Sequence, residues 1–295
     1  MSKIVIWGLR SDLHSHKFIH RSFFENFQAL GLETIWVDDR EQNVSYVKKE
    51  DTVLAVDVAS KFLPKIKGVK YVLHNISPAL LELENKFLNI QVHTNSSSGE
   101  NLGLPYVSWD SGRRILFQPW GVPAQPKYWL KFNSVQKRKE FWIGSIWNNA
   151  QNQGNSVFMQ GYRSALKRNK ISLVQKGTTT RIHPNGMSEI KAMSLENKSA
   201  IGSAVVGNWQ KDNGYIPCRL FKNIASGALP ISNANFRELF GENGGIFESN
   251  PELLIEKALS LSNATKMKMN SDAQNAILPY TYAENIRRIL KFLEE

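Results

Sequence analysis

The sequence places an arginine at the start of an apolar helix, in a position that suits a phosphate. In the stretch NGYIPCRLFKNIASGALPIS, residues 213–232, Pro217 suits the first turn of a helix and Gly227 suits its end. Arg219 falls in that first turn. A guanidinium at the positive end of a helix is unfavourable unless an anion offsets it. The stretch therefore predicts that Arg219 binds phosphate through its planar fork of N–H donors.

The remaining residues of this helix predict how it is buried. Leu220, Phe221, Ile224 and Ala225 recur at helical spacing and form its apolar face. The alternative to phosphate binding is that Arg219 pairs with a nearby carboxylate such as Asp212.

A second group of chemically capable residues follows the first predicted strand. The segment RSDLHSHKFIH contains Asp12, His14, His16 and His20. A histidine with an adjacent aspartate at the carboxyl end of a strand suits a general base and the residue that orients it. His14 and His16 point in opposite directions if the segment is extended, so we expect only one of them to act. His74, at the end of another strand, is a rival candidate.

Strands and helices alternate in the elements that must hold these residues. Compact apolar strands at 3–8, 33–39, 51–57, 70–76 and 89–95 are separated by helical patterns, the clearest of which has Phe18, Phe23, Phe27 and Leu30 on one face and ends at Gly31. This rhythm predicts a parallel sheet with helices on both faces.

The rhythm breaks in a segment rich in Pro, Gly and aromatic residues, with a predicted hairpin near residues 110–112. A second strand–helix series follows, which predicts two Rossmann-like α/β domains facing each other across a cleft. Ligands in such folds lie at the carboxyl ends of the strands. The predicted parts are, in chain order, an N-terminal, acceptor-side domain at 1–125, a linker at 126–140, a C-terminal donor domain at 141–280, and a final helix at 281–295 that returns to the N-terminal domain.

Composition limits the class of protein. The 295 residues are 42% hydrophobic and 21% charged, as in an ordinary globular protein, and the net charge of +11 favours anionic partners. A single cysteine, Cys218, excludes an intramolecular disulfide. Neither a membrane-spanning run nor a signal-peptide pattern is present in the sequence. We expect a cytoplasmic protein, with peripheral contact to a membrane surface left open and no specific nucleic-acid partner.

The arginine segment also resembles a known family. GYIPCRLFKNIASGALPIS, with WIGSIWNN before it and FESNPELLIEKALSL after it, looks like the donor domain of GT-B-fold glycosyltransferases. It is most similar to the CgeB-like group and more distantly similar to the α-1,3-fucosyltransferases. The resemblance covers roughly 141–295 and implies a transferase that moves a sugar from a nucleotide-activated donor to a glycan or another hydroxyl acceptor.

The resemblance assigns roles to individual residues. Arg219 matches the basic residue near the donor diphosphate, and Gly144 and Ser145 match the loop close to the donor phosphates. The family's acidic residue that reaches the ribose falls on Lys222, which is a departure from the pattern. Tyr215 and Asn223 are the nearest substitutes, and we expect them to contribute to donor binding.

We expect neither a metal nor another cofactor, with the nucleotide-sugar serving as a co-substrate. The sequence has no Asp-x-Asp triplet and no His/Cys cluster of ligand spacing. The diphosphate charge must then be met by helix ends and basic side chains. Lys176 and Arg181, which flank the loop KGTTTR, are the predicted helpers, although each alone is also typical of a solvated surface.

Two other functions remain open from the sequence. The pI near 9.6 and the eight tryptophans suit a nucleic-acid-binding protein, but no recognised nucleic-acid-binding module is present. The departure at Lys222 suits a catalytically inactive paralogue that binds a nucleotide or sugar without transferring it.

Overall fold

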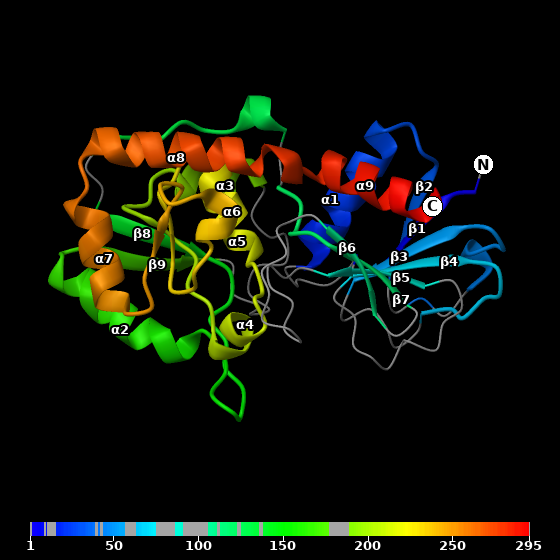
Figure 1. Ribbon diagram of the computed structural model, residues 1–295, viewed down its shortest axis with the longest axis horizontal. Helices are drawn as coiled ribbons and strands as arrows, with labels where there is room; N and C mark the ends of the chain where they lie inside the picture. The colour runs from blue at the N-terminus through cyan, green and yellow to red at the C-terminus, as the bar shows by residue number, and fades with distance from the viewer. Residues whose placement is uncertain are drawn as a thin grey trace. The chain divides into compact units, whose positions relative to one another are not determined.

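The fold was analysed in a computed structural model of the chain (Figure 1). The structure describes residues 2–8, 10, 16–38, 41, 44–56, 63–74, 86–90, 106–110, 113–122, 125–135, 138–176 and 189–294. Internal contacts divide the chain into two compact units, and each is described by itself. The first unit contains the described residues of 1–91, 104–119 and 282–295, and the second contains those of 120–281.

The first unit is built on a seven-stranded sheet. Its order is β2-β1-β3-β4-β5-β7-β6, and every neighbouring pair is parallel except β6 with β7. The strands are β1 (Ile4–Trp7), β2 (Thr34–Val37), β3 (Thr52–Val56), β4 (Lys70–His74), β5 (Lys86–Ile90), β6 (Tyr106–Asp110) and β7 (Arg113–Phe117). The predicted hairpin near residues 110–112 is confirmed as the β6–β7 pair. The strand predicted at 89–95 overlaps β5 at residues 89–90, and residues 91–95 lie outside the described residues.

Helix α1 (His16–Ala29) packs on this sheet as its apolar spacing predicted. Phe23 and Phe27 are buried, whereas Phe18 and Leu30 are only half-buried. Gly31 follows the helix with φ +77°, a backbone conformation that glycine adopts without steric cost. The core of the sheet includes buried side chains of β1, β3 and β4, namely Val5, Trp7, Val53, Tyr71 and Leu73. Buried loop residues such as Leu63 and Val69 pack against them. A short 3-10 helix, η1 (Val44–Tyr46), follows β2.

The C-terminal helix α9 (Tyr282–Glu294) belongs to the first unit, where it contacts α1 (Figure 1). The ring of Tyr282 meets that of Phe23 edge-on at 5.1 Å. Asn285 Nδ2 donates to the carbonyl of Pro119 at 2.8 Å. Arg288 is half-buried, and its Nε donates to Gln118 Oε1 at 2.9 Å.

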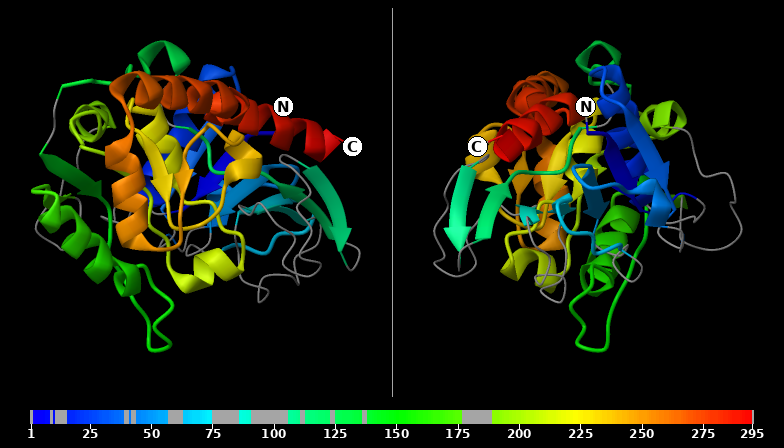
Figure 2. Two further views of the ribbon diagram at one scale, coloured as in Figure 1. Left: turned by 60° about the vertical axis from the view of Figure 1, so that its left-hand side comes forward. Right: turned by 90° about the vertical axis from the view of Figure 1, so that its right-hand side faces the viewer.

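The second unit contains two parallel sheets in an α/β arrangement (Figure 2). The pair β8 (Lys139–Ile143) and β9 (Ser172–Lys176) forms one sheet, and β10 (Gly202–Ser203), β11 (Pro230–Ser232) and β12 (Ile246–Phe247) form the other. The helices are α2 (Ser156–Arg168), α3 (Glu189–Glu196), α4 (Asn208–Asp212), α5 (Cys218–Ala225), α6 (Arg237–Phe240), α7 (Pro251–Ser260) and α8 (Asn263–Ile277), with 3-10 turns η3 (Pro126–Tyr128) and η4 (Leu278–Tyr280).

Helices α2 and α7 contact each other and the strands, while α5 contacts β10, β11 and α8. The core beside α2 and α7 includes the buried side chains of Trp142, Met159, Tyr162, Ile231 and Leu254. None of the helices within the described residues combines the length and hydrophobicity that a membrane span requires.

The two sheets of the second unit are joined along one seam. Ala200 N donates to the carbonyl of Lys139 at 2.8 Å, and Phe141 N donates to Ser199 Oγ at 2.9 Å. These bonds hold β8 beside the segment that leads into β10. The carboxyl ends of β8 and β10 therefore lie at the same edge.

Candidate functional site

Gly144 stands directly after β8 and leaves room for a cation. Its φ is +134°, and a Cβ at this position would lie 2.2 Å from Arg219 Nη2. Any larger residue would therefore displace the guanidinium. The glycine predicted to lie near a phosphate thus contacts the arginine predicted to bind it.

Arg219 occupies the first turn of α5 and is held from two sides. Its Nε and Nη2 donate to the carbonyl of Ile143 at 3.2 and 2.9 Å, and its Cζ lies 3.6 Å from the ring centroid of Trp142. Burial lowers the pKa of Arg219 to about 10, and the electrostatic influence of nearby acidic groups, Glu196 among them, opposes that shift. Arg219 is therefore a cation at neutral pH.

The guanidinium retains capacity for a ligand. The guanidinium has five N–H groups. One on Nε and one on Nη2 donate to the carbonyl of Ile143, and the described residues provide no acceptor for the others. The alternative partner, Asp212, is exposed and forms no ion pair with Arg219 in the part of the chain that the structure describes. A fork of N–H donors fixed in place in this way is suited to phosphate oxygens.

Helix α5 forms much as its sequence predicted. Leu220, Phe221, Ile224 and Ala225 are all buried. Pro217 is the residue before the helix rather than within its first turn, and no side chain among the described residues caps that end. Gly227 follows the helix with φ +73°, and a Cβ there would meet the carbonyl of Lys131 at 2.4 Å.

The loop after β8 is tied down around Ser145, which is half-buried. Its carbonyl accepts from Trp142 Nε1 and from Asn155 Nδ2, each at 3.4 Å. Asn155 Oδ1 also accepts from Trp147 N at 2.9 Å. These bonds fix the path of the chain from β8 to α2.

Glu140 closes the seam between β8 and β10 from inside the core. Its carboxylate accepts from Ile201 N at 3.0 Å, from Ser203 N at 3.2 Å and from Ser203 Oγ at 2.6 Å. Tyr162 Oη donates to it at 3.4 Å. Burial raises the pKa of Glu140 to about 7, although these four hydrogen bonds oppose the shift. The Glu140 side chain thus accepts hydrogen bonds from the backbone N–H groups of Ile201 and Ser203 and links β8 to β10, two residues before Trp142.

The raised pKa of Glu140 predicts that stability depends on pH. An acid whose pKa is higher in the folded state favours folding below its unfolded-state pKa, and this contribution is lost as pH rises through the folded-state pKa. For a rise from 4.5 to about 7, we expect the free energy of unfolding to fall by about 2–3 kcal/mol between pH 5 and pH 8. Glu140→Gln should remove this component. Urea unfolding of both proteins at the two pH values measures it, and equal pH dependence in the two would contradict it.

The other predicted donor residues lie in different surroundings. Lys176 is exposed at the end of β9, and its carbonyl accepts from Gly144 N at 3.0 Å. Tyr215 is half-buried, and its hydroxyl accepts from Trp120 Nε1 at 3.1 Å. Asn223 is buried, and its Nδ2 donates to the carbonyl of Ser203 at 3.1 Å. Arg181 lies outside the described residues.

Most of the predicted catalytic cluster cannot be placed. Asp12 and His14 lie outside the described residues, and His16 is described only as the first residue of α1. The structure does place His20, which is buried with its ring against Gly8, where a Cβ would meet it at 2.2 Å. His74 is also buried, at the end of β4.

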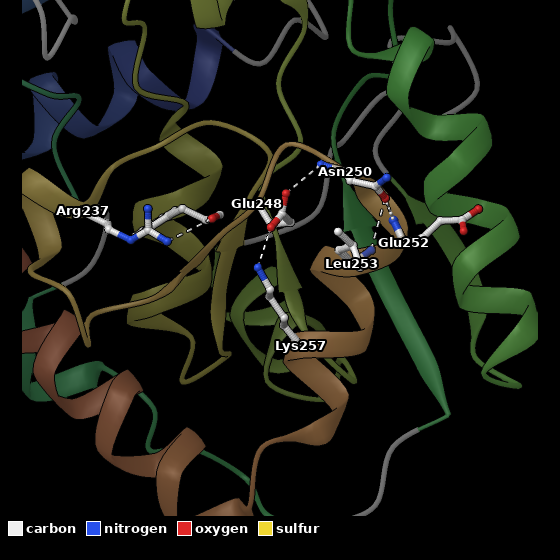
Figure 3. A network of polar contacts seen from close by, with 7 residues as sticks. Arg237, Glu248, Asn250, Glu252, Leu253 and Lys257 are labelled. Carbon is white, nitrogen blue, oxygen red and sulfur yellow. Dashed lines mark hydrogen bonds and ion pairs between the residues drawn. The ribbon is translucent and has the colours of Figure 1, made fainter.

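An acidic residue at the carboxyl end of β12 has its charge compensated (Figure 3). Glu248 pairs with Lys257 at 2.5 Å and accepts from Asn250 N, and the hydrogen bond from Lys257 is the largest cause that lowers its pKa. Asn250 Oδ1 caps α7 by accepting from Glu252 N and Leu253 N. The negative charge of Glu248 is thus paired with the ammonium group of Lys257.

No group of three or more His, Cys, Asp or Glu side chains within the described ranges could hold a metal ion. The positive charge of the second unit comes from its side chains. Residues 92–103 and 120–281 together contain 20 Lys and Arg against 11 Asp and Glu, a net charge of +9.

Sequence reasoning missed the support behind Arg219. Trp142 and Glu140 project on the same face of β8, two residues apart, and Tyr162 meets Glu140 from α2. A glutamate within the otherwise apolar run EFWIG was the available signal. A charged side chain in such a run is rarely buried without partners, so it indicated a local polar network.

Comparison with known proteins identifies the fold. No protein-family model and no curated protein sequence matches the chain. Several solved structures do match it. An alpha-glucosyltransferase in complex with UDP and a 13-mer DNA containing an HMU base superimposes with a TM-score of 0.65 at 13% identity, covering 100% of both chains.

Two further structures agree. The DNA-modifying enzyme beta-glucosyltransferase matches with a TM-score of 0.60 at 12% identity over 99% of this chain and 100% of that one. An alpha,alpha-trehalose-phosphate synthase (UDP-forming) from Burkholderia xenovorans matches with a TM-score of 0.57 at 11% identity over 95% and 79% of the respective chains. The chain therefore has the GT-B fold of glycosyltransferases, with two Rossmann-like units.

Proposed function

We propose that this protein is a glycosyltransferase that uses a nucleotide-activated sugar. The observation that carries the proposal is the Arg219 guanidinium, packed over Gly144 at the carboxyl end of β8 in a GT-B fold. The carboxyl ends of parallel strands are where such folds bind nucleotides. The net charge of +9 on the second unit supports the same assignment.

The donor we propose is a UDP-hexose. Structures with this fold were solved with UDP or UDP-glucose, and the trehalose-phosphate synthase is described as UDP-forming. In our proposal Arg219 binds the diphosphate, with Gly144 and Ser145 beside it. Tyr215 remains the candidate for a nucleoside contact. Asn223 would act through its buried bond to Ser203 rather than by direct contact.

Departure of UDP leaves negative charge on its terminal phosphate, and fixed cations can stabilise that charge. Arg219 is held rigidly by Ile143 and Trp142, so it requires little reorganisation during the reaction. Lys176, at the end of β9, and Arg181 are proposed to add to it. We infer that transfer does not depend on a metal ion, because protein cations meet the diphosphate.

The acceptor must lose a proton as its hydroxyl attacks the sugar. We propose that His14 or His16 takes this proton and that Asp12 orients the histidine. The three residues follow β1 in the first unit, and helix α1 begins at His16. We also propose that the Arg219 segment is of the CgeB-like type.

The acceptor has two candidates. The sequence favours a glycan or another hydroxyl compound. A second candidate, a base hydroxyl in duplex DNA, is favoured by the net charge of +11 and by the alpha- and beta-glucosyltransferases, whose descriptions include DNA and which match this chain over nearly its full length. Basic surfaces bind nucleic acid through its phosphates. Transfer to DNA would place the protein among DNA-modifying enzymes rather than glycan-synthesising ones.

The proposal is tested by release of UDP in the presence of EDTA. We expect the protein to release UDP from a UDP-hexose when the correct acceptor is present, at a rate that EDTA leaves unchanged. The acceptor panel includes oligosaccharides, unmodified duplex DNA and duplex DNA that contains hydroxymethylated bases. Arg219→Ala serves as the negative control.

Each outcome has a distinct meaning. UDP release that EDTA abolishes and manganese restores would overturn metal independence. Binding of UDP without turnover of any UDP-sugar would favour the inactive paralogue instead. Tight binding of unmodified DNA without any UDP binding would replace the transferase proposal with a nucleic-acid-binding function.

A further inference from the structure

A basic cavity lies at the other end of the second unit's strands. It has a volume of about 580 Å³ and is lined by residues that precede the strands: Arg138 before β8, Ile171 before β9 and Ala200 before β10. The site around Gly144 lies after β8. Five strand residues span roughly 16 Å, so the cavity is separate from the proposed donor site.

Three cations line this cavity, each from a different segment. Arg138 precedes β8, Lys170 follows α2, and Lys266 lies on α8. No lining residue is Asp or Glu. Within the described part of the chain, none of the three forms an ion pair. Arg138 and Lys170 are exposed and Lys266 is half-buried, so all three are accessible to an anion that enters the cavity.

Two of these cations have a defined local environment. The side chain of Lys266 is half-buried, and burial lowers its pKa. Lys170 has φ +57°, in the left-handed region, which costs a residue other than glycine roughly 1–2 kcal/mol. Its N–H is bonded to the carbonyl of Lys167 at 3.0 Å, which fixes the turn. The positive φ of Lys170 belongs to the turn that ends α2, where Ile171 N also donates to the carbonyl of Leu166 at 2.9 Å, and this turn brings Lys170 to the cavity.

The rest of the lining suits a small polar molecule. Ile171, Ala200 and Leu259 form an apolar wall, and the amides of Asn133, Asn169 and Asn263 are the hydrogen-bonding groups beside it. Asn263 Nδ2 donates to the carbonyl of Ser134 at 3.3 Å and thereby ties α8 to the opposite wall. A volume of this size is typical of small-molecule sites, which occupy about 300–1,000 Å³.

We propose that this cavity binds a phosphorylated small molecule of the hexose phosphate class. The three cations would hold the phosphate, and the asparagine amides would bind sugar hydroxyls. The site is independent of the proposed donor site and does not rest on the proposed function.

Isothermal titration with mannose 6-phosphate tests the proposal, with mannose and inorganic phosphate as partial ligands. We expect mannose 6-phosphate to bind more tightly than either. Lys266→Gln and Arg138→Gln should each weaken binding roughly tenfold, the effect of removing one charge-assisted contact. Lys268→Gln is the matched control, because Lys268 lies two residues further along α8, does not line the cavity and should leave the affinity unchanged.

Arg219→Ala distinguishes the two sites, because it should leave binding of mannose 6-phosphate unchanged. Absence of binding at millimolar mannose 6-phosphate would overturn the proposal. Equal affinity in Lys266→Gln, Arg138→Gln and the unmodified protein would also overturn it. Binding of short duplex DNA that is lost in the same two variants would assign this surface to nucleic acid instead.

Discussion

Deletion of residues 282–295 is expected to unfold the first unit. These residues form α9, whose side chains of Tyr282, Ile286, Ile289, Phe292 and Leu293 are buried. Each large apolar side chain contributes about 1.5–3 kcal/mol on burial, so the five together approach the total stability of a typical domain, about 5–15 kcal/mol. The expected result is loss of helical signal in circular dichroism and rapid proteolysis within residues 1–119.

A point variant keeps this prediction testable if the truncated chain is not obtained. Ile289 is 1% exposed, and Ile289→Ala should lower the free energy of unfolding by about 2–5 kcal/mol. Lys291→Ala, on the exposed side of the same helix, should change it by less than about 0.5 kcal/mol. Equal stability of the two variants would show that α9 is not part of the first unit's core.

The second large effect is expected at Gly144. An alanine there would place its Cβ 2.2 Å from Arg219 Nη2 and displace the guanidinium from Ile143 and Trp142. Gly144→Ala should therefore weaken UDP binding as Arg219→Ala does, by roughly ten- to a hundredfold, the loss of about 1.5–3 kcal/mol from a charged hydrogen bond. Isothermal titration of UDP into each folded variant measures it.

Gly241→Ala is the matched control for this substitution. Gly241 also has a positive φ, +73°, but a Cβ at that position would meet nothing within 4 Å. Both alanines carry the same kind of backbone strain, and only Gly144→Ala moves Arg219. Unchanged UDP affinity in Gly144→Ala would separate Arg219 from nucleotide binding, whereas equal losses in both glycine variants would show a general effect of strain.

Local patterns in the sequence predicted much of the fold. Short apolar strands that alternate with amphipathic helices indicated parallel sheets, because such strands are buried on both faces. The buried face of α5 and its end at Gly227 followed from helical spacing and from glycine's tolerance of positive φ. These features depend on residues close together in the chain, so the sequence alone was sufficient for them.

Features that depend on distant residues were harder to predict. The Glu140 network joins residues about sixty positions apart, and two of its donors, the backbone N–H groups of Ile201 and Ser203, cannot be read from a side-chain pattern. Helical spacing puts Arg288 on the polar face of α9, yet its side chain is half-buried and donates to Gln118 Oε1. Arg219 and Gly144 were both singled out, but their direct contact required the structure.

Hydrogen–deuterium exchange with and without UDP tests the central claim most directly, because it locates the nucleotide on the chain. We predict that UDP slows exchange in peptides covering 142–147 and 217–223, the segments that contain Gly144 and Arg219. Arg219→Ala should remove that protection at the same UDP concentration. Protection confined to peptides of the first unit, or to the cavity segments around 133–138 and 263–266, would contradict the assignment of the donor site.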